Sequence, residues 1–241
     1  TGWSAPAAEV LTTELEGWLR LALTPGVGDT TARALLVTFG SPESIFLQNR
    51  AALAAIASPA QVEQLLAPPD SLDSALAATR AWLDAAPDSR RVLTLADTMY
   101  PAALLEVPDP ALMVYAIASP AFWEAGKWPE QALAVVGSRN PTPQGASNAR
   151  MFARDLAQRG VCVVSGLALG VDGAAHEGAL EGGAGICRTI AVVGTGLDRV
   201  YPARHRDLAH RIAEHGVLLS EYPLGTPPLA HNFPRRNRII C

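Results

Sequence analysis

The chain has 241 residues and is 49% hydrophobic, which is enough to bury one large core or two small ones. No apolar run reaches about 18 residues, and the first 20 residues lack a basic region followed by an apolar stretch. The sequence therefore predicts a cytoplasmic protein without a membrane segment. The cysteines, Cys162, Cys187 and Cys241, have no CxxC spacing, so we expect no disulfide framework, no metal and no cofactor.

The charge is divided unevenly along the chain. Residues 1–131 carry 7 Lys and Arg against 15 Asp and Glu, a net charge of −8, whereas residues 132–241 carry 12 Arg against 8 acidic residues, a net charge of +4. Every basic residue in the second part other than histidine is arginine, whose planar guanidinium suits phosphate and base stacking. The split favours an anionic partner for the second part, although a mixed surface in an arginine-rich protein would produce the same counts.

The first part, residues 1–88, is predicted to be a small all-helical domain of the SAM-like type. Ala, Leu and Glu dominate it, and Pro, Gly and Ser interrupt it at short intervals. The stretch from Leu23 to Leu36 is typical of a helix-hairpin-helix, whose Gly-Val-Gly turn can present backbone N–H groups to a phosphate. Because few basic residues, among them Arg33 and Arg50, lie near this turn in a strongly acidic domain, protein docking or a purely structural role is favoured over DNA contact.

The second part, residues 89–241, is predicted to be a Rossmann-like α/β domain. After a connector with two short strands, apolar runs recur at intervals of about 30 residues and alternate with helical patterns, which is the length of a βαβ unit. Continuous Val, Ile and Leu strands favour a mostly parallel sheet with helices on both faces. The expected strands are 132–136, 161–164, 189–193 and 217–219, and the expected helices are 143–159, 171–181 and 204–215.

Each expected strand leads into a loop of small or polar residues, and in a parallel sheet these loops meet at the carboxyl edge. Glycines there allow close approach to a phosphate, and Ser138, Ser165 and Thr195 add hydroxyl donors. The pattern predicts a phosphate-binding crevice. Neither a complete GxGxxG that opens a helix nor a GxxxxGK[ST] occurs, so a dinucleotide or nucleoside triphosphate is not the expected ligand.

The order of these motifs resembles that of the DNA-processing protein A (DprA/Smf) family, from about residue 97 to the end. The motifs that carry the resemblance are residues 135–139, 164–172 with Ala175 and His176, 189–198 with Tyr201 and Pro202, 219–221, and 232–240. The resemblance implies a dimeric, non-catalytic protein that binds single-stranded DNA, protects incoming DNA and helps to load RecA on it in natural transformation and recombination. It also implies that the α/β domain is C-terminally incomplete here.

Eleven residues are predicted to contact DNA. Arg139 matches the phosphate-pocket arginine of the family, and Arg188 is aligned with its lysine, although residues 182–187 depart from the usual short turn. A phenylalanine can stack a base, and the neighbouring arginines and asparagine can bind phosphates or base edges. The set comprises Ser138, Arg139, Ser165, Gly166, Arg188, Gly194, Phe233, Arg235, Arg236, Asn237 and Arg238.

Structural roles are the alternatives for several of these residues. Phe233 could fill the core beneath a loop, the arginine cluster could pair with Glu221 and Asp198, and Arg139 could clamp the sheet edge. Asp172 and His176 stand four residues apart on one helix face, but with no third ligand in the sequence a capping carboxylate and a supporting histidine are favoured over a metal site.

Two other functions compete with DNA binding. A nucleotide hydrolase of the lysine-decarboxylase-like group would share the fold and the phosphate crevice. However, residues 181–185 lack the Thr and the following Glu of that group's signature, so Glu221 would be the candidate general base. A protein adaptor that works through the acidic helical domain alone is the third reading, and it predicts that Arg139 has no effect on DNA affinity.

Overall fold

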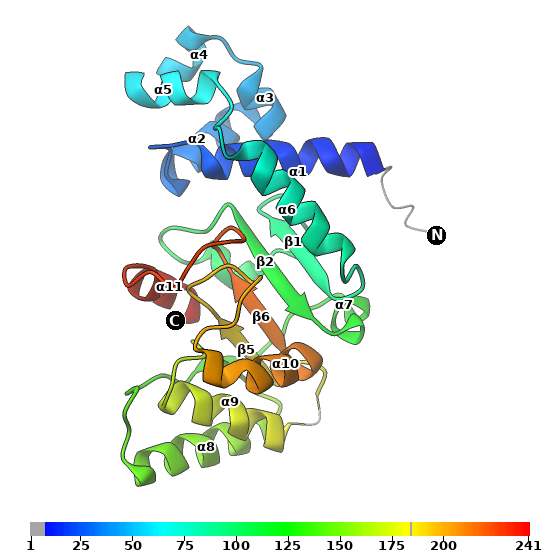
Figure 1. Cartoon of the computed structure of the whole chain (residues 1–241), viewed down its shortest axis with the longest axis vertical. Coiled ribbons are helices and arrows are strands. Elements are labelled where there is room, and N and C mark those ends of the chain that lie inside the picture. Colours follow the sequence, from blue (N-terminus) through cyan, green and yellow to red (C-terminus); the bar gives the residue numbers. More distant parts are fainter. Residues whose placement is uncertain (1–7, 184) are drawn as a thin grey trace. The chain divides into compact units, whose positions relative to one another are not determined.

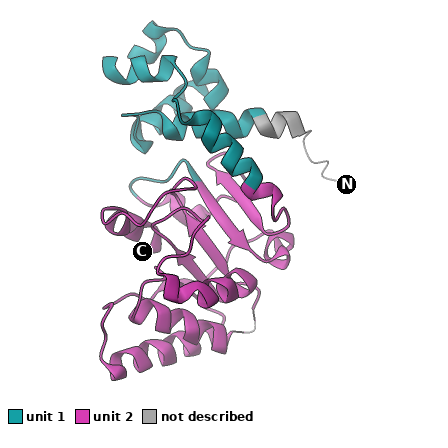
Figure 2. Ribbon diagram, in the orientation of Figure 1, with its two compact units in different colours: residues 1–81, 108–113 teal, residues 82–107, 114–241 magenta. Residues whose placement is uncertain are grey.

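The computed structural model describes residues 8–183 and 185–241. The chain separates into two compact units: the first comprises residues 1–81 and 108–113, and the second comprises residues 82–107 and 114–241 (Figure 2). The sequence placed its division at residue 88. In the structure, residues 82–88 belong to the second unit and residues 108–113 to the first. All residues that line the pocket described below belong to the second unit.

Between residues 8 and 81, the regular elements of the first unit are helices. They are α1 (Ala8–Leu23), α2 (Asp29–Phe39), α3 (Pro42–Phe46), α4 (Arg50–Ala54), α5 (Pro59–Leu66) and the first part of α6 (Leu72–Asp84). Three of them begin where the side chain of Ser41, Asn49 or Ser58 accepts a hydrogen bond from a backbone N–H of the first turn. A tight turn with Gly26 at φ +73° joins α1 to α2.

The sheet of the second unit has the strand order β1-β2-β6-β5-β4-β3. Strands β3, β4, β5 and β6 are parallel to one another, and β2 pairs antiparallel with β6. The strands are β1 (Arg90–Thr94), β2 (Met113–Ala118), β3 (Ala132–Ala134), β4 (Cys162–Ser165), β5 (Thr189–Val192) and β6 (Val217–Ser220). All residues of β4, β5 and β6 are buried, which explains their uninterrupted apolar sequence.

Helices lie on both faces of this mostly parallel sheet, and the predicted fold class is confirmed (Figure 1). α8 (Pro143–Gln158), α9 (Val171–Gly182) and α10 (Arg206–His215) connect successive parallel strands and pack against β4, β5 and β6. The remaining elements are α7 (Pro120–Ala125), α11 (Asn232–Ile240) and the short 3₁₀ turns η1 (Ala102–Leu105) and η2 (Ala203–His205). Within the described ranges, no helix has the length and apolarity that a membrane span needs.

Small residues bring α8 and α9 unusually close together. A Cβ atom added at Gly178 would lie 2.0 Å from the carbonyl oxygen of Arg150, and one at Gly182 would lie 2.2 Å from that of Arg154. Beneath this contact, Ala153, Ala157 and Val163 form a buried cluster with Ala175 and Ala179. Glycine at these two positions therefore sets the distance between the helices, and the backbone of α8 leaves no space for a side chain.

We predict that Gly178→Ala lowers the free energy of unfolding by about 1–3 kcal/mol, because the added methyl group forces α8 and α9 apart. Urea denaturation of the purified chain measures this change. Gly185→Ala is the matched control, since a Cβ atom at Gly185 meets nothing within 4 Å. Equal stability of the two variants would contradict the close packing of these helices.

Candidate nucleic-acid interface

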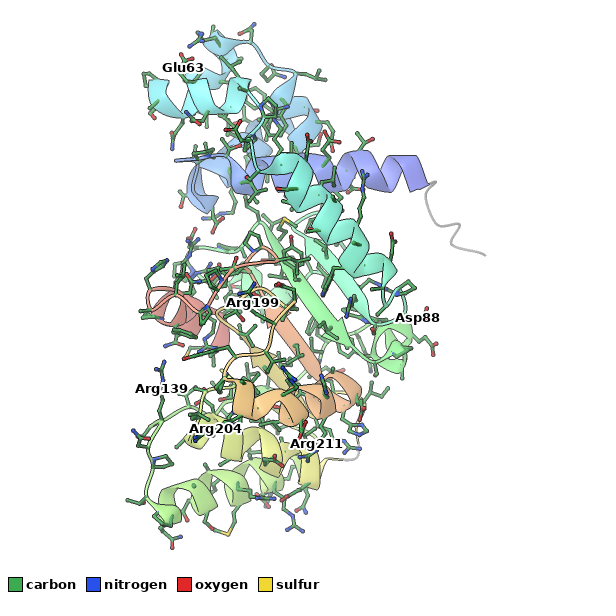
Figure 3. All side chains as sticks on the ribbon, in the orientation of Figure 1. Glu63, Asp88, Arg139, Arg199, Arg204 and Arg211 are labelled. Atoms are coloured by element: carbon green, nitrogen blue, oxygen red, sulfur yellow. The ribbon has the colours of Figure 1, made fainter. Side chains whose placement is uncertain are left out.

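A pocket of about 490 Å³ lies at the carboxyl edge of the parallel strands, as the sequence predicted. Its walls come from the β3–α8 loop, the β4–α9 connection, the loop after β5, and the segment from Pro228 to the end of α11. Arg139, Asp172, Tyr201, Phe233, Arg236 and Asn237 provide its chemically distinctive side chains. Figure 3 labels Arg139 on the β3–α8 loop.

Backbone contacts join the first two loops of this edge. The N–H of Val171 donates to the carbonyl oxygen of Ser138 at 3.0 Å. Gly170 has φ +86°, and a Cβ atom there would lie 2.3 Å from the same carbonyl oxygen. The glycine is thus required by both its backbone conformation and the close approach of the loops.

Arg236 joins α11 to the next two loops. Its side chain is 4% exposed, and Nη1 donates to the carbonyl oxygen of Gly166 at 2.7 Å and also to that of Val192. Burial lowers the pKa of Arg236 below its usual value, and the Asp172 carboxylate opposes part of this shift. Arg236 was predicted to contact DNA, but the structure uses its guanidinium to hold the pocket wall together.

Asp172 holds the β4–α9 loop. Its Oδ2 accepts hydrogen bonds from the N–H groups of Gly166, at 3.1 Å, and Ala168, at 3.4 Å. The N-cap of α9 is Gly170, so Asp172 caps the preceding loop and not the helix on which it lies. This carboxylate is 5% exposed and accepts from two backbone donors, which explains its presence beside the pocket.

Three side chains, those of Arg139, Tyr201 and Phe233, combine charge with aromatic surface, and we call them the Arg139 cluster. The guanidinium carbon of Arg139 lies 5.5 Å from the ring centroid of Phe233, and the rings of Tyr201 and Phe233 lie 5.6 Å apart. Phe233 is half-buried and lines the pocket, so it does not simply fill the core. The guanidinium can bind a phosphate and the rings can stack on a base, so the cluster can bind both parts of a nucleotide.

Tyr201 was not among the predicted site residues. It is 45% exposed and lines the pocket from the loop that follows β5. The sequence did offer a signal, because Tyr201 is an aromatic residue of a motif that resembles the family and follows a strand whose loop was expected at the carboxyl edge.

Two further predicted residues, Asn237 and Ser138, lie at this edge. Asn237 is exposed and lines the pocket, while its Oδ1 accepts a hydrogen bond from Nε of Arg236 at 3.2 Å. Ser138 is exposed on the β3–α8 loop, where its hydroxyl oxygen accepts from the N–H of Asn140 at 3.0 Å. The Asn237 amide nitrogen and the Ser138 hydroxyl proton can each serve a ligand.

The carboxylate of Glu221 balances the other two arginines of α11. Its side chain is 5% exposed and pairs with Arg238, and its Oε2 lies 4.0 Å from Nε of Arg235. One alternative from the sequence was that the arginine cluster pairs with Glu221, and the structure shows this pairing for Arg235 and Arg238. Asp198 instead pairs with Arg199, at 3.3 Å. Arg235 is half exposed and retains surface for a ligand, whereas Arg238 is mostly covered.

Three predicted contacts are enclosed by the protein itself. Ser165 is fully buried, and its hydroxyl donates to the carbonyl oxygen of Val135 at 2.7 Å. The N–H of Gly166 is bonded to Asp172, and a Cβ atom on Gly166 would collide with Arg236. Gly194 is buried against the ring of Phe233, and its carbonyl oxygen accepts from Nδ2 of Asn232 at 3.1 Å. None of the three is among the residues that line the pocket, and their contact with DNA stays a prediction.

Arg188 lies at the opposite edge of the sheet from the pocket. It immediately precedes β5, and its guanidinium donates to the carbonyl oxygens of Leu180, at 3.0 Å, and Gly185, at 3.4 Å. The structure therefore does not bring Arg188 together with Arg139, contrary to the alignment made from the sequence. Its role is to hold the last turn of α9, where cationic side chains are favourable.

His176 is fully buried and neutral. The hydroxyl of Thr189 donates to the carbonyl oxygen of Val163 at 2.6 Å, so it must accept from Nδ1–H of His176, 2.7 Å away. Burial, followed by the nearby His205 and Arg236, lowers the pKa of His176 to about 3. Among the residues that the structure describes, no group of three or more His, Cys, Asp or Glu could hold a metal ion.

The fold and the pocket define a Rossmann-like protein whose carboxyl edge offers arginine and aromatic surface to a ligand. The family model of DNA recombination-mediator protein A matches residues 91–241, and the chain belongs to this family. The resemblance recognised in the sequence is confirmed.

Relatives and solved structures agree with this assignment. Protein Smf of Synechocystis is 43% identical over 150 residues, covering 62% of this chain and 36% of that protein. Protein Smf of Escherichia coli is 53% identical over 109 residues, covering 45% of this chain and 28% of that protein. The chain thus spans about a third of these curated relatives.

Two relatives whose structures have been solved share the fold. DNA processing protein A from Streptococcus pneumoniae superimposes with a TM-score of 0.68 at 30% identity, over 95% of this chain and 74% of that chain. DNA processing protein A from Helicobacter pylori, described for its unique single-stranded DNA binding mode, has a TM-score of 0.52 at 32% identity, over 62% of this chain and 64% of that chain.

We predict that Arg236→Met lowers the free energy of unfolding by about 3 kcal/mol, because two buried carbonyl groups and Asp172 lose their cationic partner. Thermal or urea denaturation measures the loss. Arg235→Met is the matched control, since the side chain of Arg235, the preceding residue, is half exposed. A variant as stable as this control would show that Arg236 does not hold the loops.

We also predict that His176 makes stability depend on pH. Because its pKa is 6.5 when unfolded and about 3 when folded, the unfolded chain binds one more proton between these values. Stability therefore falls as the pH falls through this window, with a slope that approaches about 1.4 kcal/mol per pH unit. Unfolding measured between pH 4.5 and pH 7 should show a weaker pH dependence in His176→Asn, and identical slopes would contradict the buried neutral imidazole.

Proposed function

We propose that the carboxyl-edge pocket binds single-stranded DNA without catalysing a reaction. The Arg139 cluster is the observation that carries this proposal. Arg139 makes no hydrogen bond or ion pair with another described residue, so its charge is available to a phosphate, and the rings of Tyr201 and Phe233 beside it are available to a base. Phosphate neutralisation and stacking together are the usual means of holding a single strand with little sequence preference.

The shape of the site favours a flexible strand over a duplex. The aromatic surface lies in a pocket of about 490 Å³, and a base must leave the helical stack to reach it. A single strand splays a base at small cost, whereas a duplex must first break a pair and its stacking. Weaker binding of duplex DNA is therefore part of the proposal.

Family membership extends the proposal to the cellular role. We infer that the complete protein protects incoming single strands and helps to load RecA on them during natural transformation and recombination, acting as a homodimer in the cytoplasm. The name of the family, DNA recombination-mediator protein A, and the DNA-binding relative from Helicobacter pylori support this role. Two copies of the pocket would lengthen the DNA track and raise avidity.

The carboxylates near the pocket favour binding over hydrolysis. Asp172 is the carboxylate among the pocket-lining residues, and backbone N–H groups occupy its Oδ2. Glu221 is buried and paired with Arg238, so it is poorly placed to activate water. Release of the base from nucleoside monophosphates, abolished by Glu221→Gln, would instead support the nucleotide hydrolase.

We predict that Arg139→Ala and Phe233→Ala each weaken the binding of a single-stranded oligonucleotide, by different mechanisms. Loss of Arg139 should flatten the plot of log affinity against log salt by about 0.7, the value for one phosphate of a single strand. Loss of the Phe233 ring should lower affinity about tenfold without changing that slope. Fluorescence anisotropy over a salt series, with single-stranded and duplex oligonucleotides, measures both effects.

Arg188→Ala is the control, because it removes the same charge at the opposite edge of the sheet and should leave affinity unchanged. Wild-type affinity of both Arg139→Ala and Phe233→Ala would reject the pocket and favour an adaptor that acts through the helical unit.

A further inference from the structure

Two cysteines lie together at the amino edge of the parallel sheet. Cys162 is the first residue of β4, and Cys187 lies two residues before the start of β5. The parallel register pairs Val163 with Thr189, so the start of β4 lies beside the segment that leads into β5. The sulfur atoms of the two cysteines are 3.8 Å apart, and both residues are free thiols. Because they stand 25 residues apart along the chain, no spacing motif indicated this pair.

The separation of the two sulfur atoms is close to what a disulfide requires. At 3.8 Å the atoms are in van der Waals contact, whereas a disulfide bond is about 2.05 Å long. Rotation about the Cα–Cβ bond of each cysteine and a small shift of the segment before β5 can supply the difference. The sheet therefore holds two thiols, far apart in sequence, at a distance from which they can react with each other.

The two thiols differ in their access to solvent. Cys162 is 1% exposed, so a reagent in solution does not reach it directly. Cys187 is partly exposed, and the residues before it, Gly185 and Ile186, are exposed. The hydrogen bond with Cys187, followed by burial, holds the pKa of the Cys162 thiol well above its usual value, so this thiol stays protonated. Cys187 is therefore the thiol that an oxidant meets first.

We propose that Cys162 and Cys187 form a reversible redox site, in which a hydroperoxide oxidises Cys187 and Cys162 then closes a disulfide with it. In the first step the sulfur of Cys187 attacks one oxygen of hydrogen peroxide. An S–O bond forms, the O–O bond breaks, and the other oxygen leaves as water with the thiol proton, so that Cys187 is oxidised to a sulfenic acid.

The second step uses the buried thiol. The sulfur of Cys162 attacks the sulfur of Cys187, so the S–S bond forms, the S–O bond breaks, and the hydroxyl group leaves as water with the proton of Cys162. Together the two steps convert two thiols and one peroxide into one disulfide and two waters. A dithiol reductant restores both thiols by exchange and is itself oxidised to a disulfide.

The disulfide closes a covalent loop that contains the rest of β4 and the whole of α9. It fastens the start of β4 to the segment before β5, which Arg188 already holds to the end of α9 through the carbonyl oxygens of Leu180 and Gly185. Such a cross-link stabilises the folded chain chiefly because it restricts the unfolded one. The site lies at the edge of the sheet opposite the pocket, so the proposal stands whether or not the pocket binds DNA.

The test uses the chain with Cys241→Ser, because Cys241 is exposed and can link two copies. The protein is treated with increasing concentrations of hydrogen peroxide, its remaining thiols are alkylated, and its peptides are weighed by mass spectrometry. Trypsin releases both cysteines in one peptide, residues 160–188, and further cleavage after Glu177 and Glu181 separates them unless a disulfide joins the fragments.

We expect the fragments to stay joined after oxidation, with a mass lower by two hydrogen atoms, and to separate after treatment with dithiothreitol. The midpoint of thermal unfolding should rise by about 5–10 °C in the oxidised form and return on reduction. An oxidised form that unfolds at the same temperature as the reduced form would contradict the fastening of β4 and α9.

Two further variants, each combined with Cys241→Ser, test the order of the steps. Cys162→Ala should stop at a sulfenic acid on Cys187, which dimedone labels, whereas Cys187→Ala should keep Cys162 as a free thiol at the same peroxide concentration. Sulfinic acid on Cys187 beside a free Cys162 in the Cys241→Ser chain, or disulfides between two copies, would overturn the proposal. If Cys162→Ala does not fold, the fragment masses of the Cys241→Ser chain decide alone.

Discussion

A single buried guanidinium, that of Arg236, connects the elements whose ends form the pocket. It reaches from α11 to the carbonyl oxygens of Gly166, which follows β4, and Val192, which ends β5, while Asp172 supplies the nearby negative charge. A buried cation is stable only where partners replace its water, so the loops and α11 must take this arrangement together. The position of Phe233, three residues earlier on α11, follows from it.

The arginines of the second unit differ in their function because they differ in their partners. Arg236 is buried and structural, Arg238 is paired with Glu221, and Arg188 holds the end of α9. Arg139 is exposed at the carboxyl edge, where no hydrogen bond or ion pair with another described residue engages it, and only a charge of this kind gains much from a phosphate. The net charge of +4 in this region therefore overstates the number of residues available to DNA and does not locate them.

The position of Arg139 at the carboxyl edge follows from a strand and its loop, and the structure places this residue at the pocket. Phe233 and Asn237, which lie on α11, also line the pocket, and contact of all three with DNA stays a prediction. Ser165 and Gly166 satisfied the same rule, but one hydroxyl bonds to Val135 and one N–H bonds to Asp172, partners that are 30 and 6 residues away in the chain. Arg188 precedes β5 and lies at the edge of the sheet opposite the pocket, which an alignment across residues 182–187 did not indicate.

The sequence by itself determined the helices of the first unit, the alternation of strands and helices in the second, and the edge at which their loops meet, because these follow from local periodicity, capping and chain connectivity. Only the tertiary structure decided which arginines are buried, paired or available, and which ring lies beside Phe233. Those outcomes depend on contacts between residues distant in sequence, where burial and a single carboxylate change the role of a side chain that is chemically the same everywhere.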